Sequence, residues 1–348
     1  MDKNSSQKIE FSAEAFVRCL LEEGTKNPCD ETATAFKENT DLPQFYDETL
    51  YKRGQKFFTD NIFSLLYGKF LGLLTILAVP TILRVLVHTK MSGSPLTAYR
   101  RYLATLFHMV IWYRSDFNPG SKLWQSIAEV RNKHNIASKR CHSAGFARIS
   151  QTDMAFTQFG FMGYALARRE KVGLYNVKDE DLRAFVHVWR VVGFVMGIED
   201  RFNICRDSLD ETVEICKVLA STVFKPLFEK KDEEFLQMAS YLSDGMWAMN
   251  PTLNAKLYLN LAYRLLQMPE NNNSSVNALL IELNLLQRIF YKILIFTIWS
   301  LQFAIFKLYH NYTQYRTFWL MRHFPFLAYY KYGYANSHVK VLEDIKSQ

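Results

Sequence analysis

The chain has 348 residues, of which 49% are hydrophobic and 15% aromatic, so it carries enough apolar surface for a sizeable core and is not globally disordered. Lys and Arg number 42 against 34 Asp and Glu, and the resulting charge of +8 leaves nucleic acid and an anionic membrane as candidate partners. The five cysteines are scattered and form no C-x-x-C pair, which argues against a disulfide framework and against a structural zinc site.

Residues 1–50 form a mixed-charge N-terminal segment, in which one short amphipathic helix is expected at about 13–23. Residues 1–60 carry 12 acidic and 8 basic side chains, so the net positive charge belongs to the rest of the chain. The start has no basic leader followed by an apolar core, so no cleavable signal peptide is expected.

A helical body is expected over residues 51–268. Apolar residues recur there at spacings of three and four, and the whole chain has only 14 glycines and 9 prolines to interrupt helices. A polar linker at 269–275 separates this body from a basic, aromatic helical tail at 276–348. These features predict an all-α fold. Breaks between helices are expected at 91–95, 118–120, 142–149, 173–179, 206–210 and 249–253.

Two carboxylate-free stretches, 61–115 and 283–342, each hold an uncharged run of 14 residues, at 70–83 and at 293–306. A membrane-spanning helix needs about 20 apolar residues, so both runs favour core or interfacial helices. The second run precedes a tail rich in Tyr, Trp, Lys and Arg, which favour the membrane interface. We therefore expect a membrane surface as a partner. Cations spaced among apolar residues form no dense stripe, which argues against nucleic acid.

One candidate site lies on the helix expected at 96–114. Arg101, Thr105, His108 and Trp112 follow one another at steps of four, three and four, so they share one face. A cation and two polar groups on a mostly apolar helix are costly to bury unless they are paired or bind something. A solvated face, with Thr105 bonded back to its own helix, explains the pattern equally well.

A second candidate lies on the helix expected at 121–140. Leu123, Ile127, Val130 and His134 form one stripe, so His134 continues a core-facing row. Such a histidine is either a hydrogen-bonded core residue or a ligand, because a neutral imidazole in an apolar pocket is also what axial ligation of haem iron requires. The spacing does not decide between the two.

Two further pairs of polar residues belong to apolar helices, one at the start of a helix and one within a helix. Gln151 and Asp153 come directly before an apolar run, where an N-terminal cap is the first interpretation. His187 and Arg190 lie within the apolar helix expected at 179–201, as part of a polar network or of an exposed edge. No G-x-G-x-x-G, Walker, H-E-x-x-H or G-x-S-x-G motif occurs, which argues against nucleotide-binding, zinc-protease and serine-hydrolase functions.

Four motifs in this order resemble one known family. They are Arg101-x-x-x-Thr105, V-R-N-K-H ending at His134, S-Q-T-D-M-A-F-T at 150–157 and H-V-W-R-V-V-G-F-V-M-G at 187–197. The set resembles the ER-bound oxygenase mpaB, mpaB′ and rubber oxygenase (latex clearing protein) catalytic domain over roughly residues 55–205. That resemblance implies a globin-like helical core with additional helices, b-type haem, and cleavage of polyisoprenoid double bonds with dioxygen.

The resemblance also implies roles for particular residues. His134 would be the axial iron ligand, Arg101 and Thr105 would lie beside the haem as binding and catalytic residues, and Arg131 would meet a haem propionate. The position before the motif threonine, which supplies a distal lysine in some rubber-cleaving enzymes, is Ala104. That departure makes rubber a poor candidate substrate. The remaining candidates around the haem are His108, Gln151, Asp153, His187 and Arg190, with His108 and His187 the nearest by sequence to the distal side.

These inferences predict a membrane-associated, haem b-dependent oxygenase that acts with dioxygen on a hydrophobic, isoprenoid- or lipid-like small molecule. We expect an intracellular membrane, with the endoplasmic reticulum as the candidate. Two alternatives stay open. The first is a non-catalytic helical lipid-binding or membrane protein, in which His134 and Arg101 form a buried hydrogen-bonded pair. The second is a non-haem metal oxygenase with a site made by His134, Asp153 and His187.

Overall fold

The computed structural model describes residues 11–30, 42–267 and 279–342, and over these ranges it is helical with no β-strand. The all-α prediction is therefore confirmed. The helices of the body are α1 (Ala13–Glu22), α2 (Glu48–Asp60), α3 (Ile62–Ile76), α4 (Pro80–Thr89), α5 (Pro95–Arg114), α6 (Lys122–Ser143), α7 (Gln151–Ala167), α8 (Asp179–Val195), α9 (Leu209–Val218), α10 (Lys225–Glu229), α11 (Glu233–Met246) and α12 (Ala255–Leu266). The tail adds α13 (Leu285–Ser300), α14 (Ala304–His323), α15 (Phe326–Tyr332) and α16 (Tyr334–Ser337).

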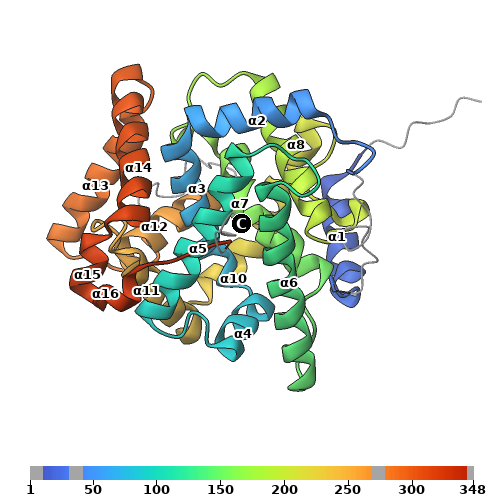
Figure 1. The fold of residues 1–348 in the computed structure, drawn as a ribbon, viewed down its shortest axis with the longest axis horizontal. Helices are drawn as coiled ribbons and strands as arrows, with labels where there is room; N and C mark the ends of the chain where they lie inside the picture. Colours follow the sequence, from blue (N-terminus) through green and yellow to red (C-terminus); the bar gives the residue numbers. More distant parts are fainter. Residues whose placement is uncertain (1–10, 31–41, 268–278, 343–348) are drawn as a thin grey trace, which may run out of the picture.

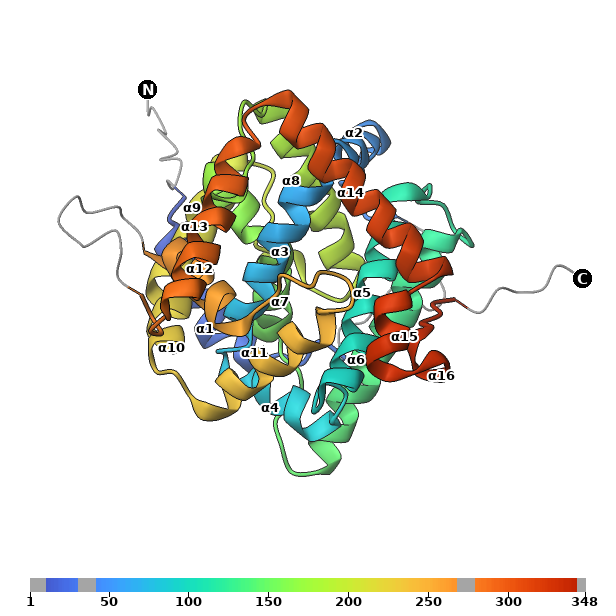
Figure 2. The same ribbon diagram turned by 90° about the vertical axis from the view of Figure 1, so that its left-hand side faces the viewer.

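Three helix pairs organise the body: α3 against α7, α2 against α8, and α5 against α11 (Figures 1 and 2). Each pair meets at a glycine. A Cβ built on Gly72 of α3 would lie 2.3 Å from the carbonyl oxygen of Gly160 in α7, and one on Gly54 of α2 would lie 2.4 Å from that of Ala184 in α8. A Cβ on Gly245 of α11 would lie 2.8 Å from α5 backbone atoms. The absence of a side chain at these positions lets the helix backbones touch.

Capping residues set the ends of the helices that carry the candidate site. Ser94 accepts a hydrogen bond from the Thr97 N–H at the start of α5, and Ser121 accepts one from the Trp124 N–H at the start of α6. Ser150 and Asp153 form a capping box at the start of α7. The predicted breaks between helices are confirmed. Other breaks were not predicted. Among them, α2 and α3 separate at Asn61, and α3 and α4 meet at 92° because Pro80 begins a new helix within the uncharged run.

The C-terminal helices α13–α16 lie together along one side of the body (Figure 1), and α14 runs beside α3 (Figure 2). Asn311 Nδ2 donates to the Asp60 carbonyl at 2.8 Å, and Tyr315 Oη donates to the Thr59 carbonyl at 2.9 Å. The tail therefore packs on the body. The linker expected at 269–275 lies outside the described residues, and the division into N-terminal segment, body and tail stays a prediction.

Among the described helices, none is by itself long and apolar enough to cross a membrane. Two pairs of consecutive helices have the length and apolar composition of a membrane span only when the two helices are taken together. They are α3 with α4, and α13 with α14, and the axes of the second pair bend by 111°.

Candidate functional site

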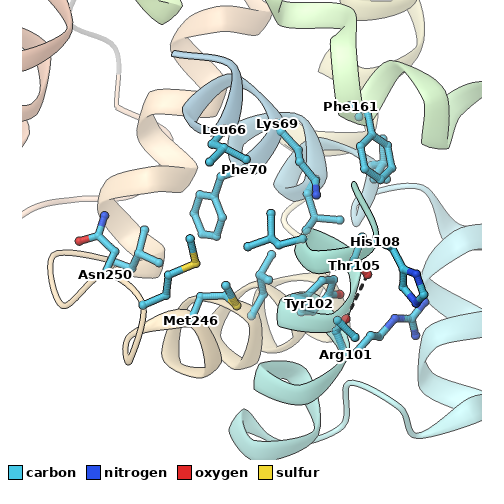
Figure 3. A pocket seen from close by; sticks show the side chains of 18 of the residues that line it. Leu66, Lys69, Phe70, Arg101, Tyr102, Thr105, His108, Phe161, Met246 and Asn250 are labelled. Carbon is cyan, nitrogen blue, oxygen red and sulfur yellow. Dashed lines mark hydrogen bonds between the residues drawn. The ribbon is translucent and has the colours of Figure 1, made fainter. Parts of the chain in front are cut away.

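A large cavity of about 1500 Å³ lies between α3, α5, α6 and α7 and extends to α12, α13 and α14. Most of its walls are apolar. Figure 3 shows Leu66 and Phe70 from α3, Phe161 from α7 and Met246 from α11 around part of it. Ligand pockets usually hold about 300–1000 Å³, so this cavity is large enough for more than one small molecule.

Arg101 and Thr105 both line this cavity from α5 (Figure 3). The Thr105 hydroxyl donates to the Arg101 carbonyl at 3.0 Å, so the expected bond back to its own helix is formed. The Arg101 guanidinium lies 5.9 Å from the centre of the Tyr102 ring, and no described carboxylate forms an ion pair with it. Its charge therefore faces an apolar cavity without a protein counter-ion.

His134 lines the same cavity from α6. Its Nδ1 atom is buried and has no hydrogen-bond partner in the described structure. Burial, followed by the nearby positive charge of Arg101, lowers the pKa of His134 to about 4, so the imidazole is neutral at pH 7. No hydrogen bond joins His134 to Arg101, so the structural pair proposed in the lipid-binding alternative is not formed.

His108 is held on the cavity wall by a network between α5 and α6. Its Nδ1 lies 2.8 Å from Ser126 Oγ, which also accepts a hydrogen bond from Trp112 Nε1 at 2.9 Å. His108 Nε2 is buried and lies 3.6 Å from Glu129 Oε1, beyond hydrogen-bond distance. Burial lowers the pKa of His108 to about 4, although Glu129 opposes the shift. If Ser126 donates to Nδ1, the neutral ring carries its proton on Nε2, which lies on the side of Glu129.

Two of the predicted site residues instead join helices. Arg131 Nη1 donates to the Val195 carbonyl at 2.7 Å, and Gln151 Nε2 donates to the Gly197 carbonyl at 2.9 Å. Neither lines the cavity. The expectation that Arg131 meets a haem propionate is therefore corrected. Three helical residues turn about 300°, so Arg131 lies about 60° around α6 from His134 and faces the end of α8.

His187 and Arg190 are also outside the cavity. His187 Nε2 accepts a hydrogen bond from the Asp47 N–H at 3.0 Å, which holds the start of α2. Arg190 pairs with Asp200 and Asp207 and covers the Phe45 ring at 4.1 Å. His187 is therefore wrong as a distal candidate, and both side chains belong to the polar-network interpretation.

Asp153 lines the cavity, but its carboxylate caps α7. It accepts from the Ser150 N–H at 2.9 Å and from Thr81 Oγ1 at 2.5 Å, which confirms the capping interpretation. In the described ranges no group of three or more His, Cys, Asp or Glu side chains is placed to hold a metal ion. The non-haem site made by His134, Asp153 and His187 is therefore not assembled.

Lys69 is a cavity residue that the sequence interpretation missed. Its side chain lies on α3, is 7% exposed, and places Nζ 4.6 Å from the centre of the Phe161 ring (Figure 3). Burial alone lowers the pKa of Lys69 to about 7. The sequence did hold a signal for this position, because Lys69 is the only charged residue between Asp60 and Arg84.

The described lining of the cavity is strongly cationic for so apolar a space. Asp153 is its one carboxylate, and that group is engaged in capping. The cations, besides Lys69, are Arg100, Arg101, Lys133, Arg140, Arg316 and Lys340. Such a lining favours an apolar ligand that carries negative charge.

Comparison with known proteins gives a family and a fold. Residues 55–224 match the family model described as ER-bound oxygenase mpaB/B'/Rubber oxygenase, catalytic domain. The structure is similar to that of latex clearing protein LCP in the closed state, with a TM-score of 0.55, 16% sequence identity and 88% of each chain covered. At that identity the similarity shows the fold alone. No curated relative matches the chain in sequence.

Proposed function

Because residues 55–224 belong to the ER-bound oxygenase mpaB/B'/rubber oxygenase family, we propose that this oxygenase depends on haem b, associates with a membrane, and acts with dioxygen on a hydrophobic, isoprenoid- or lipid-like substrate. The observation that carries the haem proposal is His134, a neutral imidazole with an unpaired nitrogen on the wall of a large apolar cavity.

The cavity fits haem b in both chemistry and size. His134 would bind the haem iron, and the apolar walls would hold the porphyrin. The Arg101 guanidinium, which has no described protein counter-ion, suits a propionate. Since the cavity volume of about 1500 Å³ exceeds that of a usual ligand pocket, space remains for a substrate chain. When bound, haem would supply the iron that activates dioxygen.

The chain's own residues would prepare the reaction in three ways. His134, held neutral by burial, keeps a lone pair available at pH 7. His108 lines the cavity as a ring fixed by Ser126, and its neutral imidazole adds a polar group to the wall without adding a net charge. The apolar walls exclude water and align the substrate.

The absorbance spectrum of the purified protein tests this proposal. We expect a Soret band, and a pyridine haemochrome assay should identify haem b. Folded, colourless protein that contains no porphyrin would reject the proposal. The non-catalytic alternative would then be favoured if the same protein retains bound lipid.

The C-terminal helices support the membrane proposal. Phe296, Trp299, Phe303 and Phe306 form a chain of neighbouring rings across the bend between α13 and α14, and each is more than 40% exposed. We call these four side chains the aromatic ladder. The same two helices line the cavity, so a lipid-like substrate would reach the cavity beside the membrane-facing surface. We assign the membrane to the cell interior, with the endoplasmic reticulum as the candidate.

Charges placed on the aromatic ladder should release the protein from vesicles. We expect Trp299→Glu with Phe303→Glu to weaken binding to phosphatidylcholine–phosphatidylserine vesicles by tenfold or more, since a buried aromatic side chain contributes about 1.5–3 kcal/mol. Vesicle flotation measures the bound fraction. Tyr330→Glu is the control, because Tyr330 is 86% exposed on α15 outside the ladder. Equal flotation of the double variant and the wild type would contradict the assignment.

Arg101 is expected to hold the cofactor by its charge. Arg101→Ala should lower haem affinity by roughly tenfold, because a hydrogen bond to a charged group contributes about 1.5–3 kcal/mol, while the helical circular dichroism is unchanged. Haem transfer to apomyoglobin measures the loss. Arg183→Ala, an exposed arginine on α8, should behave as the wild type. Normal haem retention and turnover in Arg101→Ala would remove this role.

A further inference from the structure

Lys69 lies in the cavity without any partner that balances its charge. Its side chain is 93% removed from solvent by the described structure, since its exposure is 7%, and it forms no hydrogen bond or ion pair there. Its Nζ lies 4.6 Å from the centre of the Phe161 ring, a cation–π contact. A buried amine of this kind is costly unless a ligand compensates for the lost water.

The helices packed against α3 supply no carboxylate to Lys69. The α7 residues that line the cavity next to Phe161 are Thr157, Gln158 and Gly160, which carry no charge. Helix α12 presents Tyr258 beside Phe70, and α14 presents His310 beside Phe63. Burial raises the pKa of Tyr258 and lowers that of His310, so both stay neutral at pH 7. Asp153, the one carboxylate of the lining, caps α7.

We propose that Lys69 binds the carboxylate of an aliphatic chain that lies in the cavity, so that the substrate is an amphiphilic acid such as a fatty-acid-like molecule. The amine supplies the charge that a carboxylate needs, and the apolar walls supply the contact for its chain. The single charge of one amine on α3 matches that of a carboxylate. The inference rests on the proposed function, since it names the head group of that enzyme's substrate.

Isothermal titration calorimetry of the purified full-length protein tests the proposal without turnover. We expect decanoate to bind at least tenfold more tightly than 1-decanol at pH 7. Because the pKa of Lys69 is about 7, a large fraction of the amine is neutral at that pH, and an arriving carboxylate raises its pKa. Decanoate binding should therefore take up a proton, seen as a dependence of the binding enthalpy on the buffer's ionisation enthalpy. His108 and His134 have pKa values of about 4 and do not titrate there.

Three variants separate this role from a general charge effect. Lys69→Met should lose both the preference for decanoate and the proton uptake, and it should fold, because it replaces an unpaired buried charge by an apolar chain. Lys69→Arg should keep the preference but take up no proton. Lys133→Met, at the same cavity but exposed and paired with Glu129, should resemble the wild type.

Each contrary result overturns the proposal. These results are equal affinity for decanoate and 1-decanol, no binding of either, and a preference that survives in Lys69→Met. The Soret band is recorded on the same samples. A normal band together with a contrary result rejects the carboxylate site alone, whereas a missing band rejects the haem proposal and leaves the calorimetric result to decide the binding site.

Discussion

Replacement of His134 by alanine is expected to remove haem from the protein. The side chain supplies the only neutral imidazole with an unpaired buried nitrogen on α6 among the described residues, and alanine offers no ligand in its place. Loss of an axial ligand should lower haem affinity by roughly 100-fold or more, beyond the 10–100-fold that outer residues of a metal site typically contribute. The measurement is the Soret absorbance per protein after gel filtration, with the pyridine haemochrome assay.

His142→Ala is the matched control for this experiment. His142 lies on the same helix but is exposed and outside the cavity, so its loss should leave the Soret band unchanged. Imidazole added to His134→Ala should restore part of the band, because a free ligand can enter the space left by the side chain. A full Soret band in His134→Ala without added imidazole would show that another group holds the iron.

The pH dependence of this site follows from the same histidine. Burial depresses the pKa of His134 to about 4 in the folded protein, below the ordinary value near 6.5. As the pH falls from about 6.5 to about 4, the unfolded chain takes up a proton at His134 that the folded protein does not. The free energy of unfolding and the affinity for a ligand at His134 therefore both decrease over this range. At pH 7 the imidazole is already neutral, so haem affinity should not depend on this group above pH 7.

Local rules predicted the helices and part of the site. The cap expected before the apolar run of α7 forms with Asp153, and helical spacing alone places Arg101, Thr105 and His108 on one face of α5. These features depend on residues fewer than a dozen positions apart. The sequence predicts helix caps and helix faces correctly because they depend only on residues close together in the chain.

Tertiary contacts decided the rest of the site. Arg131, His187 and Arg190 turn away from the cavity because each finds an acceptor or donor outside its own helix. Spacing along a helix does not show such partners. Lys69 was missed for the opposite reason, since an all-apolar run gives no face to which its amine belongs. Only the packing of α3 on α7 places it in the cavity.

The two glycines of α3 also differ in tertiary contacts that the sequence does not show, and stability measurements can test this difference. Gly68 and Gly72 lie one helical turn apart and look equivalent in the sequence. A Cβ on Gly72 would lie 2.3 Å from the Gly160 carbonyl oxygen, whereas one on Gly68 would have the Val172 side chain as its nearest neighbour, at an ordinary 3.5 Å. We expect Gly72→Ala to lower the free energy of unfolding by about 3 kcal/mol or more, because the α7 backbone must move.

Gly68→Ala is the control within the same helix. It should leave the free energy of unfolding unchanged or raise it by about 1 kcal/mol, since alanine favours helix more than glycine does. Urea unfolding followed by circular dichroism measures both variants. Because the α3–α7 contact also positions Lys69 over Phe161, Gly72→Ala should weaken decanoate binding as well, whereas Gly68→Ala should not. Equal stability of the two variants would mean that α3 and α7 do not meet at Gly72, and the position of Lys69 in the cavity would lose its support.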